Sequence, residues 1–290
     1  MHDFKGIPWQ YFMEFISPTA DRLTILKEVL EKAGLEYNIL EFTGYRHIIV
    51  APHNQMSFIP TLLIAHYDRA QGSPGANDNS AGVFILIETA IKLKQKNANG
   101  WRIIFTDGEE LRTGESIQTQ GSYSLAGAFK NSRVEISRIF CFDTCGSGDT
   151  LIISTTLEHL LKKNKGGKKI MASLMALRDY ALDTAKNLRM VKVILAPTPF
   201  SDDAGFFRAG LAAQTITMLP SDECKSLVSE FRKNEEFADA LINAELRQHT
   251  RRQSIPETWR GLNSAIDSHI RLTPQHFKTV VNFAEALCSR

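Results

Sequence analysis

The sequence contains no long uninterrupted hydrophobic run. None approaches the roughly 20 apolar residues that a membrane-spanning helix needs, so we expect no membrane-embedded segment. Its charges are also almost balanced, with 34 Lys and Arg against 32 Asp and Glu and a formal net charge of +2 at pH 7. A chain so close to neutrality gives no reason to expect nucleic acid or a membrane surface as a partner.

Cysteine is scarce as well. There are four cysteines, and no two of them form a CxxC pair. The first ten residues lack the charged-then-apolar layout of a signal peptide, so a cytoplasmic location is expected. In that compartment the cysteines are expected to be reduced and buried.

No internal repeat, low-complexity tract or Pro/Ser-rich linker divides the 290 residues. A hydrophobic content of 43% is ordinary for a globular protein with a sizeable core. We therefore predict a single domain over residues 1–290, with a charged helical surface insertion at about 221–258. The sequence leaves the oligomeric state open.

Short apolar runs alternate with amphipathic segments along most of the chain. Apolar residues three or four apart predict helices at 21–32, 80–95, 121–130, 171–187 and 274–287. Short apolar runs predict strands at 37–42, 47–51, 58–65, 101–106, 138–142, 151–154, 191–195 and 214–218. This alternation predicts an α/β fold: a three-layer sandwich whose central, largely parallel sheet lies between helices.

Acidic residues and one histidine lie at or just after the ends of predicted strands, or in the loop that follows one of them. They are His66, Asp68, Asp78, Glu109, Glu110 and Asp143. The carboxyl ends of parallel strands meet at one edge of a sheet, where ligand sites form. Imidazole and carboxylate are ligands of zinc. The pattern therefore predicts a metal site at this edge.

A hydrolytic metal site also needs a carboxylate that takes the proton from water, separate from the ligands. The adjacent Glu109 and Glu110 suit this division, because one can face the metal while its neighbour faces the water. Taken singly, each residue has a plainer interpretation: a Glu-Glu pair is usually a solvated surface, and a strand-ending aspartate often caps the next helix. Their common position along one predicted sheet favours the metal site.

Four motifs in this region resemble those of a known family. HYD, GANDNSAG, TDGEE and FDTCGSGD occur in family order over about Thr61 to Gly148. They are similar to motifs of the zinc aminopeptidases, which include bacterial leucyl aminopeptidase and aminopeptidase Y and have the glutaminyl cyclases as relatives. A weaker resemblance continues through PFSDDAGFFRAGLAAQTIT to the final helix. It implies a mixed eight-stranded sheet flanked by helices, and hydrolysis of N-terminal bonds of peptide or aminoacyl substrates by metal-activated water.

The resemblance also implies a role for each residue. Two zinc ions are implied, with the ligands His66, Asp78, Glu110 and Asp143. His66 and Asp143 would hold one ion, and Asp78 would bridge it to the second ion, held by Glu110. Glu109 would be the general base, and Asp68 would lie behind His66 and fix its orientation.

The chain departs from the family pattern at two places. Shortly before the last helix, Asn263 occupies the position of a histidine ligand. A neutral amide oxygen is a much poorer zinc ligand than imidazole, so the second metal position is expected to be weakened or empty; His269 could substitute only in a rearranged loop. Where relatives commonly carry Ser-Asp-His, this chain has Ser-Asp-Asp. We expect a structural role for Ser201 and a site-lining role for Asp202 and Asp203.

Three functions follow from these residues. The first is a metal-dependent, aminopeptidase-like exopeptidase with Glu109 as the base. The second is a catalytically impaired family member that acts as a binding protein; Asn263 and Asp203 favour it, whereas the retained Glu109 counts against it. The third is a glutaminyl cyclase-like acyltransferase. It is disfavoured because those relatives hold their single zinc with an Asp/Glu/His set that lacks its histidine here.

Overall fold

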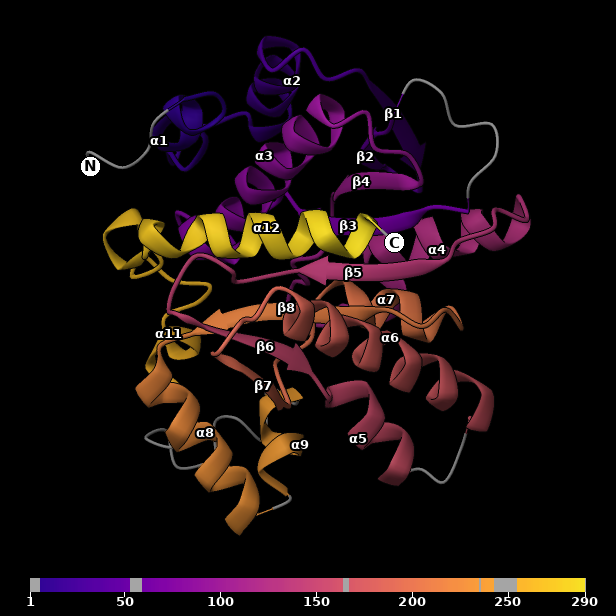
Figure 1. Ribbon diagram of the computed structural model, residues 1–290. Coiled ribbons are helices and arrows are strands. Elements are labelled where there is room, and N and C mark those ends of the chain that lie inside the picture. Colours follow the sequence, from indigo (N-terminus) through magenta and orange to yellow (C-terminus); the bar gives the residue numbers. More distant parts are fainter. Residues whose placement is uncertain (1–5, 53–58, 164–166, 235, 243–254, 290) are drawn as a thin grey trace.

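An eight-stranded mixed sheet runs through the centre of the protein, and helices cover both of its faces (Figure 1). The computed structural model describes residues 6–52, 59–163, 167–234, 236–242 and 255–289. The strand order is β1-β2-β4-β3-β5-β8-β6-β7, and the strands are β1 Tyr37–Phe42, β2 Tyr45–Val50, β3 Thr61–His66, β4 Trp101–Thr106, β5 Arg138–Phe142, β6 Thr150–Ser154, β7 Val193–Ala196 and β8 Gln214–Leu219.

The centre of the sheet is parallel and its margins contain antiparallel pairs. β3 pairs in parallel with both β4 and β5, and β5 pairs in parallel with β8. β6 and β7 are also parallel, whereas β1 with β2, β2 with β4, and β6 with β8 are antiparallel. The predicted α/β sandwich with a mixed, mostly parallel sheet is confirmed.

The helices are α1 Phe12–Phe15, α2 Arg22–Lys32, α3 Ala81–Gln95, α4 Gly121–Asn131, α5 Thr156–Lys163, α6 Lys168–Asn187, α7 Asp202–Arg208, α8 Ser221–Lys233, α9 Glu236–Ile242, α11 Glu257–Arg260 and α12 Phe277–Cys288. Shorter helical turns lie at Trp9–Tyr11, Ala76–Ser80, Ile117–Thr119, His269–Arg271 and Pro274–His276.

Most predicted elements are present, and a few differ from the prediction. β1, β4 and β5 have the predicted bounds. The helix α5, which ends at Lys163, has no counterpart among the predicted helices, and α6 starts at Lys168, three residues before the predicted start at 171. The short helix α7, also absent from the predicted helices, starts at Asp202 within the Ser-Asp-Asp sequence. Residue 58, predicted as the start of a strand, lies outside the described residues.

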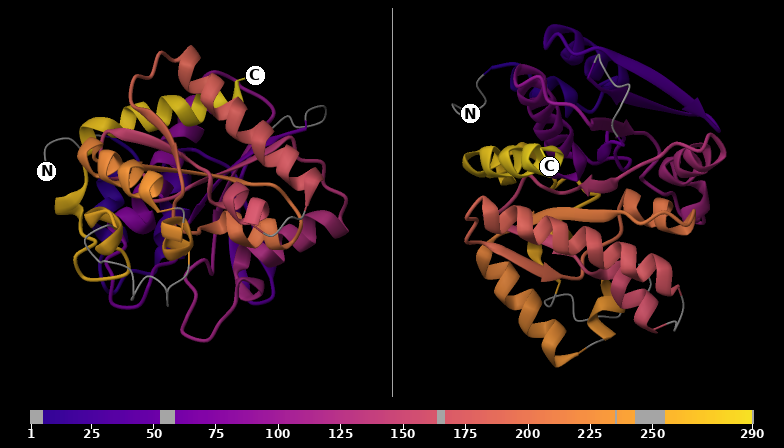
Figure 2. Two further views of the ribbon diagram at one scale, coloured as in Figure 1. Left: turned by 90° about the horizontal axis from the view of Figure 1, so that it is seen from below. Right: turned by 45° about the vertical axis from the view of Figure 1, so that its right-hand side comes forward.

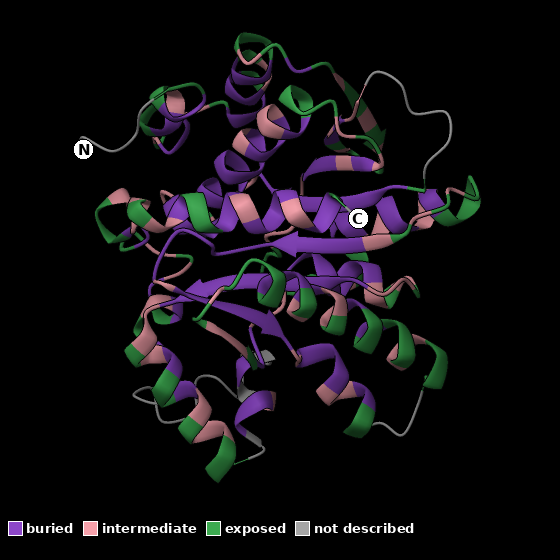
Figure 3. Ribbon diagram, viewed as in Figure 1, coloured by how far each residue is buried: buried purple, intermediate pink, exposed green. Residues whose placement is uncertain are grey.

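The side chains of β3 divide between the two faces of the sheet. Leu63 and Ala65 belong to the core beneath α3 and α12, whereas Leu62 and Ile64 pack with residues of α4 and α7. Successive residues of a strand point to opposite faces, so a shift of register by one would exchange the two sets. Burying one such aliphatic side chain contributes about 1.5–3 kcal/mol, which holds β3 in register. Figure 3 shows β3, β5, β6 and β8 as almost wholly buried.

A separate apolar cluster lies under α8, α9 and α11. It joins Ile152 of β6 and Leu219 of β8 to Leu227, Leu241 and Trp259 of these helices. Figure 2 shows α8 and α9, in orange, at the end of the sheet opposite β1. The helices α8 and α9 lie within the segment 221–258, and α11 begins inside it and ends at Arg260; the status of this segment as an insertion on a single domain stays a prediction.

The described residues also bear on two expectations from the sequence, which concern membrane-spanning helices and the state of the cysteines. None of the described helices is both long enough and apolar enough to span a bilayer. All four cysteines are free and buried, as expected for reduced core residues.

Candidate metal centre

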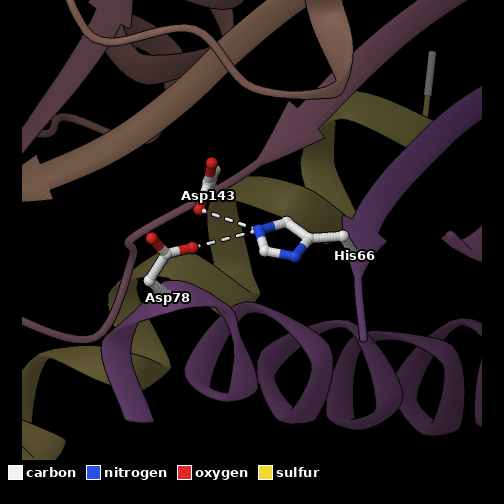
Figure 4. Close-up of side chains that lie close together, drawn as sticks. All are labelled: His66, Asp78 and Asp143. Atoms are coloured by element: carbon white, nitrogen blue, oxygen red, sulfur yellow. Dashed lines mark ion pairs between the residues drawn. The ribbon is translucent and has the colours of Figure 1, made fainter. Parts of the chain in front are cut away.

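His66 ends β3, and its imidazole is completely buried. The Nε2 atom lies 3.1 Å from Asp78 Oδ1 and 3.6 Å from Asp143 Oδ1. Figure 4 shows both carboxylates pointing toward this edge of the ring. Asp143 directly follows β5, the parallel neighbour of β3, so the sheet itself brings the histidine and this aspartate together.

Asp78 is held in place by contacts from distant parts of the chain. The Asp267 carboxylate accepts hydrogen bonds from the backbone N–H groups of Asn77 at 2.8 Å and Asp78 at 3.0 Å. The Asn79 side chain donates to the last carbonyl of β5 at 2.7 Å. A Cβ atom on Gly82 would lie 2.2 Å from Asn79 Oδ1, so only glycine allows α3 to start this close to the turn.

A buried arginine connects α2 to the loop between β3 and α3. Arg22 is only 6% exposed, and burial lowers its pKa to about 9, which still leaves it charged at neutral pH. Its two terminal nitrogens donate at 2.7–3.0 Å to the Tyr67, Asp68 and Pro74 carbonyls and the Ser80 hydroxyl. One side chain therefore fixes both ends of the loop that carries Asp78.

Asp68 connects the histidine to the glutamate pair. Its Oδ1 lies 3.4 Å from His66 Nδ1. The same carboxylate accepts hydrogen bonds from the backbone N–H groups of Glu109 at 3.2 Å and Glu110 at 3.0 Å. The Gln120 side chain donates to Glu109 Oε1 at 3.2 Å. The loop after β4 is thus positioned relative to the end of β3.

Two groups of side chains could hold a metal ion. They are His66 with Asp78 and Asp143, and His66 with Glu109 and Glu110; in each, the ligand atoms all lie within 4.8 Å of one another. His66 Nε2 and Asp143 Oδ1 are buried without a hydrogen-bond partner in the described structure. Buried polar atoms are normally paired, and coordination to a cation would satisfy both. The residues present therefore fit a divalent metal ion.

The electrostatics of the cluster also favour a cation. Burial raises the pKa of Glu109 well above its usual range and that of Glu110 to about 9. Burial and the neighbouring Asp143 raise the pKa of Asp78 to about 6. At His66 burial acts in the opposite direction, but the surrounding carboxylates outweigh it and raise its pKa. A bound cation would favour the charged form of these carboxylates and so oppose the effect of burial.

Asn263 lies beside this cluster, where the motif comparison placed it. With its amide nitrogen toward the carboxylates, it donates to Asp78 Oδ2 and to Glu110 Oε1, each at 3.1 Å. His269, the possible substitute ligand, belongs to neither metal-capable group of the described residues.

The Ser-Asp-Asp sequence lies at the start of α7, with Ser201 just before the helix. Asp202 and Asp203 start α7 and are each 1% exposed, and neither lines the cavity described below. Asp202 accepts a hydrogen bond from the Thr106 hydroxyl at 2.6 Å, and Asp203 accepts one from the Ser201 N–H at 3.0 Å. Their role at the site stays a prediction, because the buried His66 does not line the cavity either and the Asp202 carboxylate interacts electrostatically with His66 and Asp143.

A cavity of about 810 Å³ lies over the cluster. Its acidic floor consists of Asp78, Glu109, Glu110 and Asp143. Its apolar wall consists of Leu111, Ile117, Phe200, Leu241, Ile255, Trp259 and Leu262. An apolar wall with a few convergent polar groups is typical of a small-ligand site.

Two residues that position the site, Arg22 and Asp267, were not predicted from the sequence. Arg22 follows a helix N-cap and has the sequence context of a surface arginine. Asp267 lies four residues after Asn263 in the stretch compared with the family, so its position in that motif was an available signal. Both act through contacts with residues 45 or more positions away.

Solved structures of two kinds of enzyme share this fold. A zinc aminopeptidase from Bacillus subtilis is 18% identical with a TM-score of 0.56, and the match covers 83% of this chain and 49% of that one. The chain thus spans about half the length of that enzyme. The LapA aminopeptidase of Legionella pneumophila matches at 15% identity and a TM-score of 0.64 over 97% and 71% of the two chains. A Porphyromonas gingivalis glutaminyl cyclase is 15% identical with a TM-score of 0.66, and the match covers 96% of this chain and 95% of that one.

The sequence itself identifies the family. The profile of peptidase family M28 matches residues 49–268, which is most of the chain. The protein therefore belongs to peptidase family M28, and the resemblance to zinc aminopeptidases with glutaminyl cyclase relatives is confirmed. No curated protein was found to match the chain.

Proposed function

We propose that the protein is a zinc-dependent exopeptidase that removes the N-terminal residue of peptides, with Glu109 as the general base. Membership of a peptidase family supports this proposal. The observation that carries it is the convergence of His66 Nε2 with the carboxylates of Asp78 and Asp143, and of the same histidine with Glu109 and Glu110, beneath an open cavity.

His66, Asp78 and Asp143 would hold the zinc ion, and Glu110 lies close enough to the same histidine to contribute. When bound, such an ion polarises the scissile carbonyl and lowers the pKa of a coordinated water toward neutrality. Asp68, behind the imidazole, would keep the ring turned so that Nε2 faces the ion.

The protein's own part in the chemistry is the movement of a proton. The Glu109 carboxylate takes a proton from the attacking water and gives it to the nitrogen of the leaving amine as the peptide C–N bond breaks. The hydrogen bond from Gln120 to Glu109 Oε1 would hold the carboxylate in one orientation for both transfers.

The cavity favours a peptide with a free N-terminus and an apolar first residue. Its carboxylate floor attracts a positively charged α-amino group, and its aromatic and aliphatic wall accepts an apolar side chain. The carboxylates and the apolar wall line the same cavity of about 810 Å³, so one peptide end could contact both.

Cyclisation of N-terminal glutamine is the second candidate. In that reaction the α-amino nitrogen attacks the side-chain amide and ammonia leaves. The structural match that covers 95% of a glutaminyl cyclase favours it. The asparagine at position 263 argues against it, because the Asp/Glu/His set that holds zinc in those relatives is incomplete here.

The test is a panel of aminoacyl chromogenic substrates and short peptides, one of which begins with glutamine, incubated with zinc-loaded protein. Mass spectrometry separates the reactions, because hydrolysis shortens a peptide by one residue whereas cyclisation removes only ammonia. We expect shortened products from peptides with apolar first residues. Bound zinc without turnover of any substrate would reject both reactions in favour of a binding protein, and failure to bind any metal would reject the metal site.

A further inference from the structure

We propose that the protein holds one metal ion rather than two, and that the side-chain amide of Asn263 takes the place of the second ion. The proposal rests on the metal site put forward above, but it does not require that the site be catalytically active.

The amide of Asn263 faces two carboxylate oxygens from different loops. One end of this amide lies 3.1 Å from Asp78 Oδ2 and 3.1 Å from Glu110 Oε1, and we assign the nitrogen to that end because both of these neighbours are acceptors. An amide nitrogen has two hydrogens, one for each of these acceptors. In the opposite orientation the amide oxygen would face two other oxygens, and a cation between them or a proton on Glu110 would be needed to relieve the repulsion. The orientation that pairs donors with acceptors needs no second ion.

Asp78 reaches both positions of a two-metal site. Its Oδ1 lies 3.1 Å from His66 Nε2, on the side of the first ion, and its Oδ2 faces Asn263. A carboxylate that bridges two ions uses its oxygens in this way. Here the second oxygen meets an N–H donor. A zinc ion bound to Asp78 Oδ2 and Glu110 Oε1 at 2.0–2.2 Å would lie where the donor now points.

The backbone aims this side chain into the cavity. Asn263 has φ 58°, in the left-handed region. Asparagine, aspartate and histidine adopt that region more readily than other residues with side chains. Asn263 also lines the cavity beside Asp78 and Glu110. The same backbone therefore accommodates histidine or aspartate, which provides variants that add a ligand without new backbone strain.

Metal stoichiometry tests the proposal. Metal-free protein is titrated with Co²⁺ and followed by its visible absorption, and zinc bound after dialysis is measured by elemental analysis. We expect one equivalent in the wild type. We expect two in Asn263→His and in Asn263→Asp, with at least a tenfold gain in affinity for the second. Asn263→Ala, which removes the amide without adding a ligand, is the control and should bind one.

A second readout is the electron paramagnetic resonance spectrum of Mn²⁺-loaded protein. We expect the signal of an isolated ion in the wild type and spin-coupled pairs in Asn263→His. Two tight equivalents in the wild type, or one equivalent in both ligand-adding variants with circular dichroism like the wild type, would overturn the proposal. If the wild type binds two equivalents of metal and cleaves peptides, the single-ion proposal is rejected and the proposed peptidase activity is kept. If it binds one equivalent and cleaves no peptide, the single-ion proposal is kept and the peptidase activity is rejected.

Discussion

Oδ1 of Asp68 lies 3.4 Å from Nδ1 of His66, and the same carboxylate accepts the backbone N–H groups of Glu109 and Glu110. A single side chain thus orients the imidazole at the end of β3 and the loop after β4. The histidine and the glutamates lie close together because both are held by Asp68, as well as because β3 and β4 are neighbouring strands.

Asp68→Asn should weaken metal binding. Asparagine has one acceptor oxygen instead of two, so it cannot hold both N–H groups and also face His66. Loss of a carboxylate behind a metal-binding histidine typically costs 10–100-fold in affinity. Competition with a coloured chelator measures this change, and circular dichroism checks that the fold is kept. An affinity equal to that of the wild type would show that Asp68 does not position the ligand.

Glu109→Gln should remove activity and leave the metal in place. The amide keeps the shape of the side chain but cannot take a proton, and general base catalysis typically contributes 10²–10⁴-fold. We therefore expect kcat to fall by about that factor with unchanged zinc content. Glu115→Gln makes the same change on an exposed loop residue and should have no effect. Full activity in Glu109→Gln would rule out this residue as the base.

Arg22→Met should destabilise the protein strongly. The variant leaves several buried acceptors of the loop between β3 and α3 without their donor, and each unsatisfied group costs about 1–3 kcal/mol. A loss of about 3 kcal/mol or more in the free energy of unfolding is expected in urea denaturation. Lys32→Met, at an exposed position of the same helix, should change it by no more than about 0.5 kcal/mol.

Phe200→Ala should change which substrates are preferred. Phe200 and Phe207 both pack on the cluster around Leu161 and Leu174, but only Phe200 lines the cavity. Loss of an apolar wall should lower kcat/KM for large apolar first residues by roughly tenfold or more relative to alanine. Phe207→Ala makes the same truncation outside the cavity and should leave that ratio unchanged. Equal ratios in both variants would show that this wall does not select the side chain.

The strands were predictable because their side chains alternate between two buried faces. In β3 the alternation is complete, and β4 and β5 have the bounds read from the sequence. The grouping of the acidic residues followed from the rule that parallel strands end at one edge of a sheet. The short helix α5 was missed because its charged end, up to Lys163, runs into a basic stretch that looks like a loop.

The supporting contacts of the site were not predictable in the same way. Arg22 donates to loop carbonyls that have no sequence signature, and Asp267 binds N–H groups about 190 residues earlier in the chain. Likewise, the sequence shows that Asn263 replaces a histidine, but only the structure shows that its amide spans Asp78 and Glu110. Such contacts depend on the tertiary fold, which periodicity does not encode.

The floor and the wall of the cavity come from separate stretches of the chain. The floor lies at the ends of β3, β4 and β5, within residues 66–143, whereas much of the wall belongs to Leu241, Ile255, Trp259 and Leu262. Substitutions in this part of the wall should therefore leave the positions of the floor carboxylates unchanged. Evolution can therefore change which side chains the cavity accepts without changing the floor. Homologues that share the floor residues should differ in substrate preference before they differ in the reaction that they catalyse.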